Sequence, residues 1–420
     1  MTRNLMNKQK KGQRLVSIIY LFLFLQCTNF LCWLVIPNGF FAIPIKLESI
    51  ALLLFLLANL VFIKKTIKTS VSGKYVVLFC LCTIISAIPC YICHGQSFVD
   101  SFKAILPFQF LLFYFVFYKY NISEKQIATI LIIIALCKFA ILFFQQFTYP
   151  VFWFSAFREG DINNYGTEYV IEIRSGIYRY LLGMIYILYF PGLYLTSKYL
   201  DCKKRSNYLI LLILILMGIY LEQFRFNMLC FLLCWIWLNL KGHQMKVSVV
   251  HLLIIIAILF TLYANFDLLF GDLKDKTERD LSEDYIRVFA YSFYLFEYWK
   301  GPLTLLFGNG CPLPATSSYG EEITNYYEEV MHFFRADIGL LGTFNTYGFF
   351  LILILVLYIY RIYKNWTLID SSCQAFLIWL GLMIPLFFPI HYSSDTNLFM
   401  AGFIYIMDCS VQRNKLKASY

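Results

Sequence analysis

Long apolar runs, separated by short polar segments, recur along the whole chain. A membrane-spanning helix needs about 20 mainly apolar residues, and the runs are close to that length. We therefore predict an all-α integral membrane fold with about twelve spanning helices. The predicted spans are Leu15–Ile36, Leu47–Ile63, Tyr75–Cys93, Ala104–Tyr118, Ile127–Phe147, Ile177–Thr196, Tyr208–Leu221, Phe226–Leu240, Val247–Ala264, Ile338–Tyr360, Cys373–Ile390 and Leu398–Met407.

The composition agrees with this pattern. Sixty per cent of the residues are hydrophobic and 14% are charged, whereas a soluble globular chain carries roughly 25% charged residues. A soluble fold could not hide so much apolar surface. The first apolar run has no small-residue cleavage site, so we interpret it as a retained helix rather than a signal peptide. We predict one polytopic membrane domain over residues 1–420.

The basic residues predict how the spans are oriented. They cluster in both terminal tails and in alternate connections, as is typical of cytoplasmic segments. With twelve spans all these segments fall on one side, which places both termini in the cytoplasm. The net charge of +10 is then an insertion signal, and we expect no nucleic-acid partner. The basic connections include Lys64, Lys65, Lys68, Lys119, Lys198, Lys241, Lys246, Arg361 and Lys364.

Two outer connections are long, at residues 148–176 and 265–337. A long loop in a compact protein is usually functional. The larger loop precedes the last three predicted spans. Apolar and aromatic residues at helical spacing predict amphipathic helices over Ser282–Tyr298 and Glu321–Phe334, and a Gly- and Pro-rich stretch separates them. We expect the two helices to cap the outer surface.

Several ionisable residues lie at membrane depth or at its outer edge, where charges are costly and therefore functional candidates. Lys138 lies in the middle of the fifth predicted span, Arg179 opens the sixth, and Glu222 precedes a tight outer turn. For Lys138 the alternative is a structural pairing with an acid, and for Glu222 it is a pairing with Arg225. The full set is Lys138, Arg179, Glu222, Arg225, Arg287, His332, Arg335 and Asp337.

Arginines recur on the outer side, although the orientation rule would deplete them there. The guanidinium binds phosphate oxygens through a planar fork of N–H donors. A lipid-linked diphosphate at the outer leaflet would be a fitting ligand. The alternatives are snorkelling to headgroups for Arg179 and Arg225, and simple solvation for Arg158 and Arg174. The outer arginines are Arg158, Arg174, Arg179, Arg225, Arg287 and Arg335.

The sequence favours neither a metal nor a cofactor. Most of the thirteen cysteines lie inside spans, where they are small apolar fillers. Cys90 and Cys93 form a CxxC without a second pair, which is weak evidence for zinc. We find no Walker loop or dinucleotide fingerprint. His94 and His391 lie near the outer face, and we rank them below His332.

Three stretches resemble the O-antigen polymerase and ligase family of bacterial membrane glycosyltransferases. In GIYLEQFRFNMLCFLL, Arg225 opens a hydrophobic helix after a short outer turn. In DYIRVFAYSFYLFEYWKGPLTLLFGNGCP, Arg287 lies on a loop helix that is followed by Phe-Gly-Asn-Gly. In HFFRADIGLLGTFNTYGFFLILILVLY, His332 precedes a Gly-Leu-Leu-Gly span. Phe333 stands where many ligases have Asn, and the spacing to Gly-Leu-Leu-Gly is shorter, which favours a polymerase.

The resemblance implies a metal-independent surface-polysaccharide polymerase in the bacterial inner membrane. An undecaprenyl-diphosphate-linked oligosaccharide would donate its glycan to a sugar hydroxyl of another lipid-linked repeat unit. The bilayer and these lipid-linked glycans are the expected partners, with a chain-length regulator as a further candidate. The residues that we expect to bind the diphosphate are Arg179, Arg225, Arg287 and Arg335. For the base that accepts the hydroxyl proton, the first candidate is His332, followed by Asp337 or Glu222.

Three other functions stay open at this point. One is an O-antigen ligase that acts on the lipid A core. Another is a flippase or transporter for the lipid-linked oligosaccharide, although transporters commonly show internal repeats and we find none here. The third is a non-catalytic membrane scaffold, which would leave the outer arginines unexplained.

Overall fold

The computed structural model describes residues 2–37, 40–149, 151, 153–155, 171–174, 177–180, 182, 184, 186–201, 205–242, 286–313, 317–386 and 393–419. The predicted span Val247–Ala264 lies outside these ranges, as do Arg158 and His391.

The described chain is almost entirely helical. Its α-helices are α1 Thr2–Cys27, α2 Asn29–Cys32, α3 Ala42–Ala58, α4 Leu60–Thr69, α5 Gly73–Ile85, α6 Ala87–His94, α7 Phe98–Ile105, α8 Phe113–Tyr120, α9 Glu124–Thr148, α12 Tyr186–Asp201, α13 Arg205–Glu222, α14 Arg225–Gly242, α17 Ile286–Ser292, α18 Pro302–Phe307, α19 Ser318–Glu321, α20 Gly339–Lys364, α21 Ser371–Met383 and α22 Ser394–Ala418. The remaining elements are the 3-10 helices η1 Leu106–Leu112, η4 Arg335–Ile338 and η5 Trp366–Leu368, the π-helices η2 Phe293–Glu297 and η3 Glu322–Val330, and the strands β1 Ile171–Arg174 and β2 Ile177–Tyr180.

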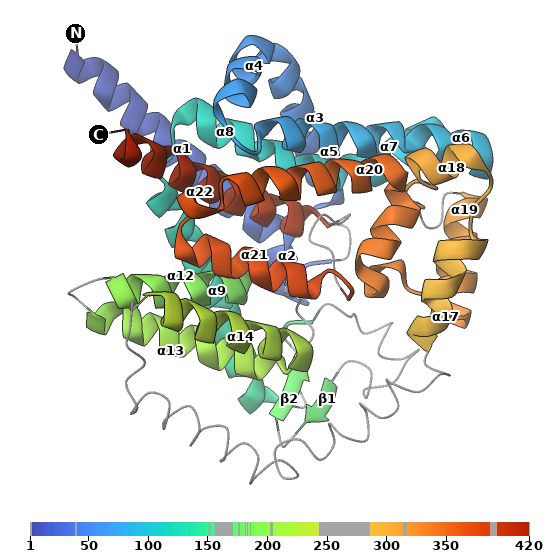
Figure 1. The fold of residues 1–420 in the computed structure, drawn as a ribbon. Helices are drawn as coiled ribbons and strands as arrows, with labels where there is room; N and C mark the ends of the chain where they lie inside the picture. Colours follow the sequence, from blue (N-terminus) through green and yellow to red (C-terminus); the bar gives the residue numbers. More distant parts are fainter. Residues whose placement is uncertain are drawn as a thin grey trace.

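The long helices run roughly side by side (Figure 1). One group contains α5, α20 and α22, and a second contains α12, α13 and α14. Both chain termini lie at one end of this bundle, while α17, α18 and α19 gather at the other end. The helices of the large loop therefore lie at the end remote from the termini.

Four helical segments in the described ranges are long and apolar enough to cross a membrane: Gly73–His94, Phe98–Tyr120, Glu124–Thr148 and Arg335–Lys364. The bent pair α3 and α4 would make a fifth. The prediction of an all-α chain with apolar helices of spanning length is confirmed at this level. The number twelve and the cytoplasmic side of the termini stay predictions.

Four predicted spans differ from the helices observed. Ile177–Thr196 is wrong at its start, because Ile177–Tyr180 forms β2 and pairs antiparallel with β1. Arg179 thus lies on a strand opposite Glu172. The helix in Leu15–Ile36 ends at Cys27, where α2 follows with left-handed backbone angles. The helix in Cys373–Ile390 ends at Met383. The fourth difference is a bend inside Leu47–Ile63.

The bend between α3 and α4 turns the chain by 83° at Asn59. The Asn59 side chain donates to the carbonyl of Phe55 at 2.7 Å, so it satisfies an acceptor in the last turn of α3. Its oxygen accepts a hydrogen bond from Lys119 near the end of α8. The Lys119 ammonium also lies 5.2 Å from the centre of the Phe55 ring. A lysine from another helix therefore holds the bend.

Both predicted helices of the large loop are present where the structure describes them. Helix α17 continues into η2 within the first predicted range. Helix α19 continues into η3, which ends at Val330 rather than at Phe334. His332 follows with a φ of +56°, a left-handed angle that ends a helix.

Charged contacts tie several connections together near the termini. Arg413 near the end of α22 contacts both Glu124 at the start of α9 and Asp370 before α21. Lys241 at the end of α14 donates to Gln374 on α21. Connections that are predicted to be cytoplasmic therefore lie beside the C-terminal helix.

A buried carboxylate joins helices in the interior of the bundle. Asp408 on α22 is 1% exposed. It accepts hydrogen bonds from the Ser72 hydroxyl at 2.7 Å and amide at 3.1 Å, just before α5. The Tyr114 hydroxyl on α8 donates to it at 2.6 Å, and the Tyr358 hydroxyl on α20 donates to Ser72 Oγ at 2.9 Å. One acid thus connects α5, α8, α20 and α22.

Candidate functional site

The large loop is attached to a kink in α20. The kink lies at Gly348, where φ is +78°. The amide of Gly310 donates to the carbonyl of Thr346 at 2.9 Å. A carbonyl of α20 next to the kink therefore accepts a hydrogen bond from the loop. A Cβ at Gly308 would collide with the Thr346 carbonyl. The Phe-Gly-Asn-Gly segment therefore needs glycine to approach α20 this closely.

Two buried asparagines connect the loop to α6 and α20. Asn309 Nδ2 donates to the Tyr298 carbonyl at 3.1 Å and to Asn345 Oδ1 at 3.2 Å. Asn345 Nδ2 donates to the Tyr294 carbonyl at 2.9 Å. His94 Nε2 at the end of α6 lies 2.9 Å from Asn309 Oδ1. Because Asn309 and Asn345 are fully buried, these amide contacts fix η2 against the two spans.

A buried arginine lies at the centre of the loop. Arg335 is 7% exposed, and both of its terminal nitrogens donate to the Tyr319 hydroxyl at 3.1 Å. Its guanidinium carbon lies 5.2 Å from the Tyr294 ring centre and 5.4 Å from the Tyr298 ring centre. These are cation–π distances. The His94 ring stacks on Tyr319 with centroids 4.1 Å apart. We call Arg335 and its three tyrosines the tyrosine cage.

The tyrosine cage holds its cation with neutral groups. Burial raises the pKa of the Tyr294, Tyr298 and Tyr319 phenols more strongly than the charge of Arg335 lowers it, so all three stay protonated. Within the described ranges no carboxylate lies within 4.0 Å of Arg335. The guanidinium is therefore enclosed by phenol oxygen and aromatic faces, and it anchors η4 to α19 and η2.

We expect Tyr319→Phe to loosen the large loop locally. The substitution keeps the ring but removes the acceptor of two Arg335 N–H groups, which costs about 1–3 kcal/mol for a buried donor left unpaired. Hydrogen exchange of peptides from 317–338 should speed up, while peptides from α22 should be unaffected. Tyr326→Phe is the matched control, because Tyr326 is 52% exposed on the same loop helix. Equal exchange in both variants would contradict the anchoring role.

Beside the tyrosine cage the structure brings two predicted site residues together. Arg287 Nη2 on α17 lies 3.7 Å from Asp337 Oδ2 on η4, and the side chains are 37% and 51% exposed. Asp337 follows Arg335 by two residues, so the tyrosine cage also positions Asp337. His332 is exposed, and its ring stacks beside Phe334 with centroids 6.4 Å apart. Arg287 and Asp337 thus form a cation–carboxylate pair that is open to solvent.

A second group of predicted residues is buried between α9 and α13. Lys138 forms an ion pair with Glu222, and the side chains are 2% and 1% exposed. Lys138 therefore pairs with an acid, which was the structural alternative for it. Lys138 also donates to the Met184 carbonyl at 3.0 Å. The Arg179 guanidinium carbon lies 4.4 Å from the centre of the Phe224 ring.

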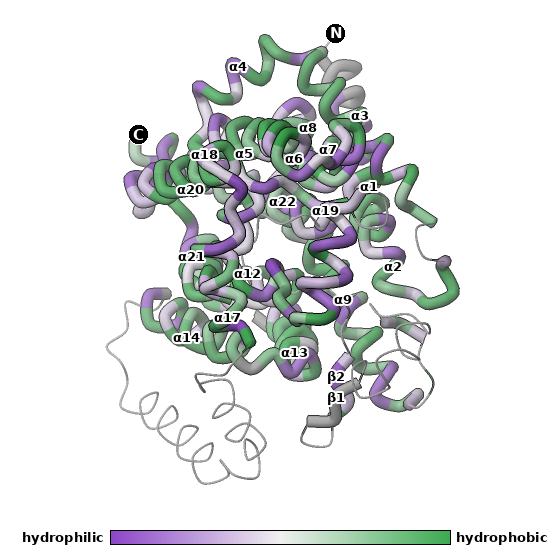
Figure 2. The backbone as a smooth tube through the Cα atoms, turned by 90° about the vertical axis from the view of Figure 1, so that its right-hand side faces the viewer, coloured by the Kyte–Doolittle hydropathy of each residue, from purple (hydrophilic) through white to green (hydrophobic). Residues whose placement is uncertain are grey.

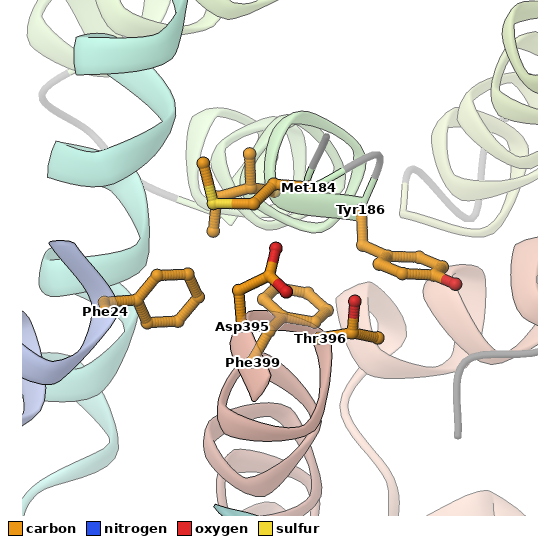
Figure 3. Close-up of a pocket in the computed structure, with 7 residues that line it drawn as sticks. Phe24, Met184, Tyr186, Asp395, Thr396 and Phe399 are labelled. Carbon is orange, nitrogen blue, oxygen red and sulfur yellow. The ribbon is translucent and has the colours of Figure 1, made fainter. Parts of the chain in front are cut away.

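Asp395, which was not among the predicted site residues, lines a small pocket together with Phe24, Met184 and Phe399. Figure 3 shows its carboxylate between these three side chains. Asp395 is 9% exposed and lies in the first turn of α22, where Ser393 donates to it. The Ser-Asp-Thr-Asn stretch before an apolar run is a helix-start signal. It predicts that Asp395 lies in the first turn of a helix.

The predicted site residues therefore form two groups, Arg287 with Asp337 and Arg335, and Glu222 with Lys138 beside Arg179. Arg287 lies on α17 and Arg179 on β2, and Figure 1 draws both elements away from the two termini. Figure 2 shows hydrophilic loop segments near α19 beside the hydrophobic α5, α6 and α20. Of Arg225 the structure describes only the backbone, at the start of α14.

Comparisons with known proteins identify no relative of this chain. No protein-family model matches the sequence, and neither the curated proteins nor the solved structures contain a match.

Proposed function

We propose that this chain is a bacterial inner-membrane polymerase that builds a surface polysaccharide from lipid-linked repeat units. The donor is an oligosaccharide linked to undecaprenyl diphosphate, and the acceptor is a sugar hydroxyl on a second lipid-linked unit. The twelve spans, with both termini in the cytoplasm, belong to the same proposal. The loop end of the bundle then faces the periplasm.

One observation carries this proposal, the half-exposed pair of Arg287 and Asp337 on a loop that is anchored to the spans. Glycan transfer from a diphosphate needs a cation where negative charge develops on the leaving group. It also needs a base at the acceptor hydroxyl. Arg287 and Asp337 supply one group of each kind within 3.7 Å. The tyrosine cage and the asparagine contacts keep both groups on rigid elements.

In the proposed step, the acceptor hydroxyl oxygen attacks the anomeric carbon of the donor. The bond between that carbon and the diphosphate oxygen breaks, and the electron pair leaves with undecaprenyl diphosphate. The hydroxyl proton passes to the base. Arg287, Arg225 and Arg179 stabilise the charge on the diphosphate through N–H donors. No metal enters this scheme.

The contacts refine which residue takes which role. Asp337 and His332 are the proposed bases, because both are exposed at the loop surface. Glu222 is held by Lys138 in the interior, so we assign it to joining α9 and α13. Arg335 is enclosed by tyrosines, and we assign it to positioning Asp337 rather than to contacting the diphosphate.

Variants Arg287→Ala and Arg225→Ala should abolish long-chain polysaccharide in a strain that lacks the native gene. Single repeat units should remain on the surface lipid, which an electrophoretic profile of that lipid measures. Membrane levels of the protein should be unchanged. The matched control is Arg361→Ala, which removes an exposed arginine from the opposite end of α20 and should leave the polymer intact.

Other outcomes would replace the proposal. Lipid-linked repeat units trapped on the cytoplasmic face would identify a flippase. The buried charged residues Lys138, Glu222 and Asp395 favour that alternative, because charges inside a membrane often line a transport path. Finished polymer left on the lipid carrier, with none on the lipid A core, would identify a ligase. Normal polymer length in both arginine variants would remove the arginines from the mechanism.

A further inference from the structure

Helix α4 stands out from the bundle (Figure 1). The Asn59 contact with Lys119 fixes its direction next to the end of α8. The end of α8 also contacts the N-terminal helix, because Gln13 Nε2 donates to the Asn121 carbonyl at 2.7 Å. Helix α4 therefore lies at the end of the bundle that carries the termini, and its bend keeps it from continuing the line of α3.

The two faces of α4 differ in chemistry. Ile63 is 3% exposed and packs against the bundle. The opposite face carries Lys64, Lys65 and Lys68, which are exposed, and Val61, which is 88% exposed. Within the described ranges no carboxylate lies within 4.0 Å of these lysines. We call Lys64, Lys65 and Lys68 the α4 lysine face.

The geometry points to a binding site for anionic phospholipid headgroups on the α4 lysine face. A short helix with lysines around an exposed apolar residue is suited to the boundary between headgroups and acyl chains. The adjoining α3 exposes Leu54 and Leu57 at 60% and 61%, which acyl chains would cover. Acyl chains on these leucines would place lipid headgroups next to α4, where three ammonium groups complement lipid phosphates. This site does not depend on the proposed polymerase activity.

The test uses purified full-length protein in an uncharged detergent, titrated with fluorescent phosphatidylglycerol, with phosphatidylcholine as the reference lipid. The variant Lys64→Gln/Lys65→Gln/Lys68→Gln should bind phosphatidylglycerol more weakly by roughly fivefold for each lysine removed. The variant with arginine at all three positions should bind as wild type does. The difference should shrink in high salt, because exposed charges are screened.

A matched control removes the same charge elsewhere near the termini. Lys10, Lys11 and Lys415 are exposed on α1 and α22, and their replacement by glutamine should leave phosphatidylglycerol affinity near wild type. Equal loss in this control would show an effect of net charge alone and would overturn the site. Wild-type affinity in the α4 glutamine variant would also overturn it, as would equal loss in the arginine variant.

Discussion

Replacing Glu222 with alanine should destabilise the folded protein by roughly 3–5 kcal/mol, because it removes one partner of a buried ion pair and leaves the charged Lys138 ammonium in the interior. Both side chains are almost completely shielded, at 2% and 1% exposure. Among its described contacts, Lys138 would keep the hydrogen bond to the Met184 carbonyl at 3.0 Å, and a neutral carbonyl does not offset the loss of a carboxylate. Unfolding by chemical denaturant in detergent micelles measures the change.

Two further variants separate the charge effect from simple loss of packing. The double variant Lys138→Met/Glu222→Leu replaces both charges by apolar groups of similar size, and it should be far closer to wild type than Glu222→Ala alone. Glu321→Ala removes an exposed carboxylate from a loop helix and should change stability little. If the double variant were as unstable as Glu222→Ala, the ion pair would not be the cause.

Asp408→Ala should also destabilise the protein strongly, by roughly 3 kcal/mol or more. The substitution leaves the Ser72 amide, the Ser72 hydroxyl and the Tyr114 hydroxyl without their acceptor in a buried site, and each unpaired donor costs about 1–3 kcal/mol. Because Ser72 precedes α5 and Tyr114 lies on α8, the contact between these helices should loosen. Thermal unfolding of the purified protein measures the loss.

Asp408→Asn is the informative partner of that variant. The amide keeps one acceptor oxygen and nearly the same volume, so it should recover part of the lost stability. Glu329→Ala, at an exposed position on η3, is the control for removing an acid from the protein. An Asp408→Ala variant that unfolds at the wild-type temperature would show that the surrounding donors find other acceptors.

The spans could be predicted where hydropathy alone decides the structure, and not where local backbone chemistry intervenes. The long apolar runs predict helices such as α9 and α20 well. The β1–β2 hairpin lay inside a predicted loop and a predicted span. Alternating Ile171 and Ile173, then Ser-Gly, then Ile177 and Tyr178 is a hairpin pattern, but an apolar window of span length averages over it. The α3–α4 bend depends on Lys119, a residue 60 positions from Asn59.

The candidate site was predicted in part. Glycine and helical spacing indicated the loop helices and the Phe-Gly-Asn-Gly segment that contacts α20. The partner of Lys138 could not be read from the sequence, because Glu222 lies on a different helix. The enclosure of Arg335 depends on Tyr294, Tyr298 and Tyr319 from two other segments. Such enclosure follows from tertiary packing, which a local pattern does not contain.

The attachment of the loop to the kink in α20 has a consequence for the order of assembly. Asn309 and Gly310 leave the ribosome before Asn345 and Thr346, whose carbonyls their amides need. During synthesis these two hydrogen bonds therefore cannot form until α20 has been made. His94 is already in place by then, since its helix is made much earlier. Helix α20 thus supplies acceptors that the preceding loop needs. In a chain truncated before Asn345, we expect this part of the loop to lack its native contacts.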